Sequence, residues 1–217
     1  MHFEILVEDI SGKTALEILV PKIIGNEHTF YVHAYKGIGR IPKNLRATSD
    51  PQKRILLDQL PRLIRGYGKT FAGYGDYPSV LIVVCDLDSR CLSAFRRELF
   101  DLVNRSDPKP DTYFCIAVEE GEAWYLGDMI AVKKAYPHAK DTTLNSYVND
   151  SICNTWELLA DALFSGGAKK LSQLGYQTIG REKTTWAEKI TPHMDIDSNL
   201  SPSFCYFRDK LRKLTSQ

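Results

Sequence analysis

The sequence predicts an α/β fold in which helices flank a mainly parallel four-stranded sheet and a helical extension follows at the C-terminus. Two observations carry this prediction. Before about residue 135, short runs rich in β-branched and aromatic residues alternate with helical stretches, as in parallel sheets covered by helices. After that point no run resembles a strand, and apolar residues recur at helical spacing. We therefore expect a core over residues 1–135 and an extension over residues 136–217 that packs on it.

Four strands are expected, and two of them differ in their side-chain pattern. The run SVLIVVC has no polar alternation, which is typical of a strand covered on both faces. The run TFYVHAY alternates, so it belongs nearer an edge, where His33 packs or hydrogen-bonds within its sheet. The predicted strands span residues 2–8, 29–35, 79–85 and 112–118.

Helical periodicity fills the segments between and after these strands. In the core the expected helices span residues 13–24, 52–71, 91–104 and 121–135. In the extension they span about residues 152–164, 167–174, 183–193 and 203–214. Ser201 is suited to cap the last of these helices, with Pro202 at its first position. Residues 135–151 form a polar stretch that predicts a loop.

The composition fits a globular protein and indicates no partner by charge. The 217 residues include 28 Lys and Arg against 27 Asp and Glu, so any basic surface must come from local clustering. Five cysteines without a CxxC pair indicate neither a disulfide framework nor a cysteine zinc site. No apolar run approaches the roughly 20 residues of a membrane span, and the N-terminus lacks a signal-peptide pattern. We therefore expect a cytoplasmic protein without a membrane partner.

Carboxylates follow three of the four predicted strands. They are Glu8, Asp9, Asp86, Asp88, Glu119, Glu120 and Glu122. Sites in open α/β sheets gather at the carboxyl ends of the strands, so these acids are expected to converge there. If the chain stays extended through Asp86 and Asp88, their side chains point the same way. Clustered carboxylates repel one another unless a proton or cation offsets their charge, and Mg²⁺ or Mn²⁺ suits such oxygen ligands.

Each acid also has an ordinary structural interpretation. Acidic residues are common where strands give way to loops, and a single one more often caps a helix or forms a turn than binds a metal. Asp9 is open to both interpretations, as a metal ligand or as the cap of the helix that follows. The three glutamates after the fourth strand are further candidates rather than principal ones.

Several families that handle phosphate carry comparable motifs. The segment SGKT at 11–14 resembles the end of a P-loop, but Val7 stands where that motif needs glycine. GIG at 37–39 fails as a dinucleotide fingerprint at Pro42. VVCDLDSR resembles the first motif of haloacid-dehalogenase phosphatases, except that Arg90 replaces its last residue, and this is a minor alternative. Glycosyltransferases with an Asp-x-Asp motif are a weaker one.

The pairing of a first-strand glutamate with a later Asp-x-Asp resembles the Toprim domain, a Rossmannoid domain of topoisomerases, primases and overcoming-lysogenization-defect nucleases. Glu8 in ILVEDISG and Asp86 and Asp88 in VVCDLDS carry this resemblance. It implies that Glu8 acts as general acid or base and that the two aspartates, with Glu8, hold Mg²⁺ or Mn²⁺. Many Toprim domains have glycine after the glutamate, whereas this chain has Asp9.

A wider resemblance covers nearly the whole chain. The segments AVEEGEAWYLGD and NLSPSFCYF resemble an uncharacterised bacterial family with a Toprim-like core, often found beside ATPase genes and suspected of roles in phage defence. The resemblance implies a metal-dependent nuclease or phosphodiesterase with an ATPase partner. The alternative is a non-catalytic Toprim-like module that binds a partner ATPase or nucleic acid.

A nuclease must also hold a polyanion, and a basic loop follows the second predicted strand. Its cations are Lys36, Arg40, Lys43 and Arg46. This loop is expected on the same side of the sheet as the acids, where the cations would contact phosphates of DNA or RNA. The ordinary interpretation is a solvated charged surface.

Overall fold

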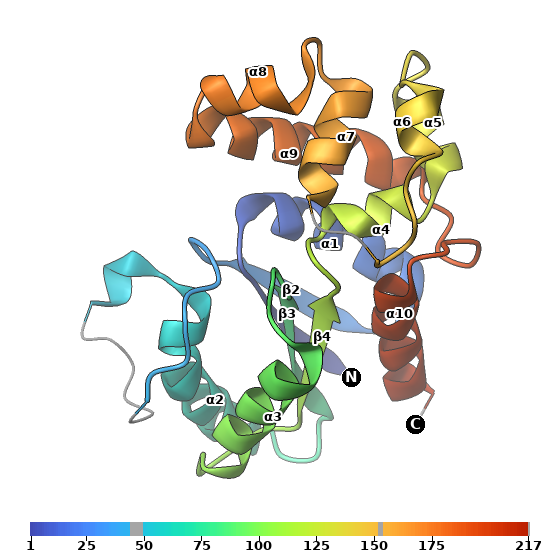
Figure 1. Ribbon diagram of the computed structural model, residues 1–217. Coiled ribbons are helices and arrows are strands. Elements are labelled where there is room, and N and C mark those ends of the chain that lie inside the picture. Colours follow the sequence, from blue (N-terminus) through green and yellow to red (C-terminus); the bar gives the residue numbers. More distant parts are fainter. Residues whose placement is uncertain (44–49, 152–153, 217) are drawn as a thin grey trace.

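The computed structural model describes residues 1–43, 50–151 and 154–216, and it confirms the predicted fold class. Four parallel strands form one sheet in the order β2-β1-β3-β4 (Figure 1). Each strand lies within two residues of its predicted bounds. The strands are β1 His2–Val7, β2 Thr29–Ala34, β3 Ser79–Asp86 and β4 Thr112–Ala117.

The register brings the strand ends together. His2 at the start of β1 pairs with Thr29 of β2 on one side and with Ser79 of β3 on the other, and all these pairings are parallel. The carboxyl ends of β1, β2 and β3 therefore meet at one edge of the sheet. The position of β2 at the side of the sheet confirms the prediction made from its alternating pattern.

Both faces of the sheet are covered, as the unbroken apolar run of β3 predicts. Alternate side chains of each strand enter two hydrophobic clusters, so Val83 belongs to one and Ile82 to the other. Helices α2 (Leu56–Ala72) and α3 (Leu92–Asn104) cover the first face. On the second face lies α1 (Ile10–Ile24), together with helices from the C-terminal part of the chain (Figure 1).

The remaining described elements after β4 are all helical. They are α4 Glu122–Leu126, α5 Met129–Ala135, α6 Asp141–Leu144, α7 Thr155–Leu163, α8 Gly167–Gln173, α9 Tyr176–Ile190 and α10 Pro202–Thr215, with a short 3₁₀ turn at Thr191–His193. A second 3₁₀ turn, Pro51–Lys53, lies before α2. Trp186 of α9 and Phe204 of α10 are fully buried in the same cluster as Phe3 of β1. The C-terminal helices therefore share a hydrophobic core with the sheet. Among the described residues, no helix is long and apolar enough to cross a membrane.

Several helix boundaries differ from the sequence prediction. Helix α1 begins at Ile10 rather than at residue 13, and α2 begins at Leu56 rather than at residue 52. The expected helix 121–135 is two helices: α4 ends before Gly127, and Asp128, with a φ of −130°, caps α5 by accepting a hydrogen bond from the Ala131 N–H. Helix α9 begins at Tyr176, seven residues before the expected start, after Gly175 with a φ of 85°. Its first two turns are mostly polar, so they lack the apolar periodicity that marks a helix.

The segment predicted as a loop after residue 135 contains one helical turn, α6, because Leu144 is buried in the hydrophobic cluster. The predicted cap of the last helix is confirmed. Ser201 precedes α10, its Oγ accepts a hydrogen bond from the Phe204 N–H, and Pro202 is the first helical residue.

Candidate active site

Two predicted acids leave neighbouring strands at the carboxyl edge of the sheet. Glu8 directly follows β1, and Asp86 is the last residue of β3, the strand paired with β1. Both line a cavity of about 40 Å³ together with Asp9, Glu122 and Lys183, which we call the acidic cavity. A space of this size holds an ion or a few water molecules, because one water needs roughly 10 to 15 Å³ of such volume.

Burial and neighbouring carboxylates oppose ionisation of both Glu8 and Asp86. Burial, then the charge of Asp9, raises the pKa of Glu8 to about 7, although a hydrogen bond with Asp86 opposes the shift. Burial and the charge of Glu8 raise the pKa of Asp86 well above its ordinary value. Glu8 Oε2 is buried without a hydrogen-bond donor among the residues that the structure describes. The pair therefore needs a proton or a cation, as the sequence predicts for converging acids.

Lys183 of α9 supplies a cation to this cavity, and sequence reasoning did not single it out. Its Nζ lies 3.1 Å from Glu122 Oε2, and both side chains are largely buried. The neighbouring carboxylates, led by Glu122, outweigh burial and raise the pKa of Lys183, so the ammonium group stays protonated. Burial raises the pKa of Glu122 to about 7 even though Lys183 opposes the shift. No motif marks Lys183, because its partners come from distant parts of the chain.

Asp88 lies outside the acidic cavity. Strand β3 ends at Asp86, so the chain does not stay extended through Asp88, whose φ is 50°. The exposed Asp88 carboxylate lies 4.0 Å from the Arg90 guanidinium, while its N–H donates to the Glu119 carbonyl. Its charge still contributes to the raised pKa of Glu8, after burial and Asp9. Asp88 thus stands at the rim of the site rather than within it.

Asp9 has the structural role that the sequence left open. It is the N-cap of α1, and its carboxylate accepts hydrogen bonds from the Gly12 N–H at 2.7 Å and from Ser11 Oγ at 2.8 Å. It also lines the acidic cavity. Asp9 therefore contributes negative charge to the cavity while its oxygens are engaged in capping.

Only one of the three glutamates after β4 joins the cavity. Glu120 Oε2 accepts hydrogen bonds from Thr155 Oγ1 and the Trp156 N–H, both at 3.1 Å, and so satisfies the first turn of α7. Glu119 is buried and its φ is 77°; burial, then the charge of Glu120, raises its pKa to about 7. Neither residue lines the acidic cavity, whereas Glu122 does.

The basic loop lies on the same side of the sheet as the acids, as predicted. Its described cations do not all lie near those acids, however. The Gly37 N–H donates to the Glu8 carbonyl at 2.8 Å, which places the adjacent Lys36 next to the end of β1. Arg40 and Lys43 instead line another cavity, of about 480 Å³, between this loop and α3. Arg46 lies outside the described residues.

The residues present fit a divalent cation only as a two-carboxylate site. No group of three His, Cys, Asp or Glu side chains that could hold a metal occurs in the described parts of the chain. Glu8 and Asp86 provide two converging carboxyl groups, one with a buried oxygen that lacks a donor. Mg²⁺ is commonly bound through one or two carboxylates, with waters and substrate phosphates completing its shell. The fit therefore depends on Glu8 and Asp86.

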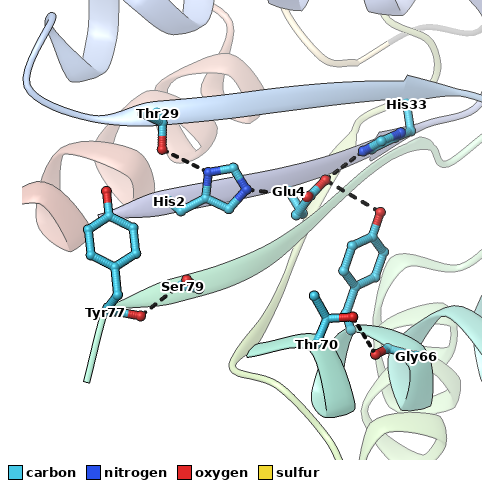
Figure 2. A network of polar contacts seen from close by, with 9 residues as sticks. His2, Glu4, Thr29, His33, Gly66, Thr70, Tyr77 and Ser79 are labelled. Carbon is cyan, nitrogen blue, oxygen red and sulfur yellow. Dashed lines mark hydrogen bonds and ion pairs between the residues drawn. The ribbon is translucent and has the colours of Figure 1, made fainter. Parts of the chain in front are cut away.

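A second cluster of titratable side chains lies on the face of the sheet that α2 and α3 cover, and its members hydrogen-bond to one another. The Glu4 carboxylate contacts His2 Nε2 at 3.2 Å and His33 Nε2 at 2.5 Å, and the Tyr67 hydroxyl donates to it at 3.4 Å (Figure 2). Burial opposes ionisation of Glu4, but the two histidines outweigh it and lower its pKa. His33 thus hydrogen-bonds within its sheet, as predicted.

Comparison of this chain with protein-family models, with curated proteins and with solved structures finds no match.

Proposed function

We propose that this protein is a metal-dependent nuclease or phosphodiesterase that acts on nucleic acid, with Mg²⁺ or Mn²⁺ bound by Glu8 and Asp86. One observation carries the proposal. Two carboxyl groups from neighbouring strands share a small buried cavity, where the pKa of Glu8 is raised to about 7 and one of its oxygens lacks a donor. The resemblance of Glu8, Asp86 and Asp88 to the Toprim pattern supports the same chemistry.

A bound divalent cation supplies polarisation of a phosphate oxygen and acidification of an attacking water. The chain's own residues handle the proton. Glu8 Oε2, which has no hydrogen-bond donor among the described residues, can accept the proton of the water and pass it on to the leaving oxygen. The water oxygen forms a bond to phosphorus, and the phosphodiester P–O bond breaks. Glu8 is therefore the proposed general base and acid, and Asp86 the proposed metal ligand.

Charged neighbours adjust the site around this pair. Lys183 neutralises Glu122 within the cavity, so fewer uncompensated negative charges face an incoming phosphate. Asp88 at the rim is the remaining proposed ligand; it has an exposed carboxylate that a larger metal and substrate assembly can reach. Lys36 is the basic-loop cation beside Glu8 and is the proposed phosphate contact there.

The cellular setting is part of the proposal and rests on the wider family resemblance. We place the reaction in the cytoplasm, in phage defence, together with an ATPase partner. Pull-down with an ATPase encoded beside this gene tests that association independently of catalysis.

The test begins with metal binding, because a silent nuclease assay can reflect a missing partner. Calorimetric titration with Mn²⁺ and Mg²⁺ compares the wild type with Asp86→Asn and Glu8→Gln, and the exposed Asp76→Asn serves as a control of equal charge change. We expect both cavity variants to lose binding while the control keeps it. A screen of DNA and RNA then follows, with Asp88→Asn expected to abolish cleavage. Equal binding by all four proteins would contradict the proposal.

A second candidate function is a non-catalytic module, and one observation favours it. The Lys183 ammonium group already provides a cation to the acidic cavity, which lets the acids persist as a structural cluster. This candidate predicts that neither DNA nor RNA is cut, with or without an ATPase partner and with either metal. The phosphatase alternative predicts turnover of phosphomonoesters by the same protein preparation.

A further inference from the structure

A groove beside the acidic cavity belongs to no function assigned above. It lies between the first turn of α1, the segment after β2 and helix α9, and it encloses about 960 Å³. Asp9 and Ser11 line both this groove and the acidic cavity, so the two spaces share a wall. We call it the α9 groove; its principal side chains are Asp9, Tyr35, Lys36, Tyr176, Arg181 and Thr184.

The cations of the α9 groove are uncommitted. Lys36 and Arg181 are exposed, and neither forms an ion pair with another residue that the structure describes. The groove's carboxylate, Asp9, already accepts two hydrogen bonds within α1. Two uncommitted cations therefore stand against one carboxylate that is engaged in capping, and this excess of positive charge suits phosphate groups.

The groove also presents an aromatic ring to solvent. Tyr176 is 93% exposed at the start of α9, just after Gly175. An exposed tyrosine beside uncommitted cations is the combination that binds single-stranded nucleic acid, because bases stack on the ring and the cations follow the backbone. A duplex keeps its bases stacked inside, so it cannot use such a ring.

We infer that the α9 groove binds one strand of nucleic acid, with a base stacked on Tyr176 and phosphates on Lys36 and Arg181. A strand bound there would lie against Asp9 and Ser11, the residues that also line the acidic cavity. This inference rests on the proposed function, since it names single-stranded nucleic acid as the substrate class of that site. It makes Tyr176 and Arg181 positioning residues.

The experiment measures binding separately from cleavage. Fluorescence anisotropy with the full-length Glu8→Gln protein follows a labelled single-stranded oligothymidylate, an oligouridylate, a DNA duplex and an abasic strand of equal length. We expect Tyr176→Ala to weaken single-strand binding about 5- to 100-fold, as expected for the loss of one stacked base. Tyr176→Phe retains the ring and should bind normally, and the remote Tyr77→Ala serves as the matched control. Comparing the affinities for the oligothymidylate and the oligouridylate shows whether the groove prefers DNA or RNA.

The contribution of Lys36 and Arg181 is measured separately, from the salt dependence of binding. Removing two phosphate contacts by Lys36→Ala and Arg181→Ala should reduce the slope of log affinity against log salt by about 1.4 for a single strand. The exposed Lys213→Ala should leave the slope unchanged. Circular dichroism and thermal melting establish that all variants are folded.

The outcomes separate this inference from the proposed hydrolase. Tyr176-dependent binding by a protein whose Mn²⁺ binding does not depend on Glu8 and Asp86 supports the groove and contradicts the hydrolase. Cleavage that Tyr176→Ala leaves intact, equal affinity for duplex and single strand, equal affinity for abasic and normal strands, or no binding of any strand overturns the groove assignment.

Discussion

The Lys183 ammonium group lies 3.1 Å from the Glu122 carboxylate and so ties α9 to the acidic edge of the sheet. We expect Lys183→Met to destabilise the protein by about 3 kcal/mol, the typical cost of removing one partner from a buried ion pair. The loss of stability in Lys183→Met should be larger near pH 8 than near pH 5.5. The pKa of Glu122 is about 7, so at pH 5.5 Glu122 can take up a proton and no longer needs the missing cation.

Urea unfolding at both pH values provides the measurement, and the exposed Lys169→Met is the control. If Mn²⁺ binds beside Glu8, it should restore part of the lost stability of Lys183→Met, because it replaces the missing cation. An equal loss at the two pH values would contradict the pairing of Lys183 with an ionised Glu122.

Glu8→Gln should stabilise the metal-free protein at alkaline pH. The pKa of Glu8 is raised from 4.5 to about 7, so its stabilising effect is complete below about 4.5 and is lost as the pH rises through about 7. Glutamine stays neutral and avoids this loss, which is worth up to about 3 kcal/mol near pH 8 and about 1 kcal/mol near pH 5.5. Urea denaturation in the presence of a chelator, with Asp76→Asn alongside, measures it. A constant difference between these pH values would count against an elevated pKa for Glu8.

Metal affinity should depend on pH in the same range. A cation bound by Glu8 and Asp86 must displace a proton that the raised pKa values of these two groups retain, so binding competes with protonation. We expect Mn²⁺ affinity to rise about tenfold per pH unit below 7 and to level off above it. Titration calorimetry in two buffers of different ionisation enthalpy reports the released proton. Proton-free binding would argue that the ion sits away from this pair.

Gly127 offers a test of the packing between α4 and the segment before α10. A methyl group there would lie 2.3 Å from Asn199 Oδ1 and 2.7 Å from the Ser201 nitrogen, so Gly127→Ala should cost about 1 to 3 kcal/mol. In contrast, a Cβ at Gly66 within α2 meets no atom within 4 Å, so Gly66→Ala should stabilise by about 0.5 to 1 kcal/mol. Thermal melting of both variants checks the opposite signs.

Much of the sheet follows from local sequence, because a run such as that of β3 can only belong to a strand covered on both faces. The meeting of Glu8 and Asp86 follows from the parallel arrangement, since both residues leave the same edge. The position of Asp88 could not be predicted in this way. In the sequence, the alternation of side chains between the two faces of a strand could continue through Asp86, Leu87 and Asp88. In the structure, Asp88 is instead in the left-handed region, and its N–H donates to the Glu119 carbonyl.

The parts of the site that sequence reasoning missed depend on tertiary packing. Lys183 reaches the cavity only because α9 packs against α1. The start of α9 at Tyr176 was not predicted, because its first turns are mostly polar and lack the apolar spacing of a helix. Glu120 looks like another converging acid, yet it serves the first turn of α7. Charge at a strand end predicts the location of a residue but not which neighbour its oxygens bind.

The contribution of α9 also bears on how the protein is made. During synthesis the sheet is complete once β4 has emerged, but Lys183 and the Tyr176 wall of the groove follow much later in the chain. Until then the carboxyl groups at the sheet edge lack their internal cation, and the groove proposed for a single strand lacks the wall that α9 provides. The charge balance of the sheet edge is therefore completed only after the C-terminal helices have folded onto the sheet.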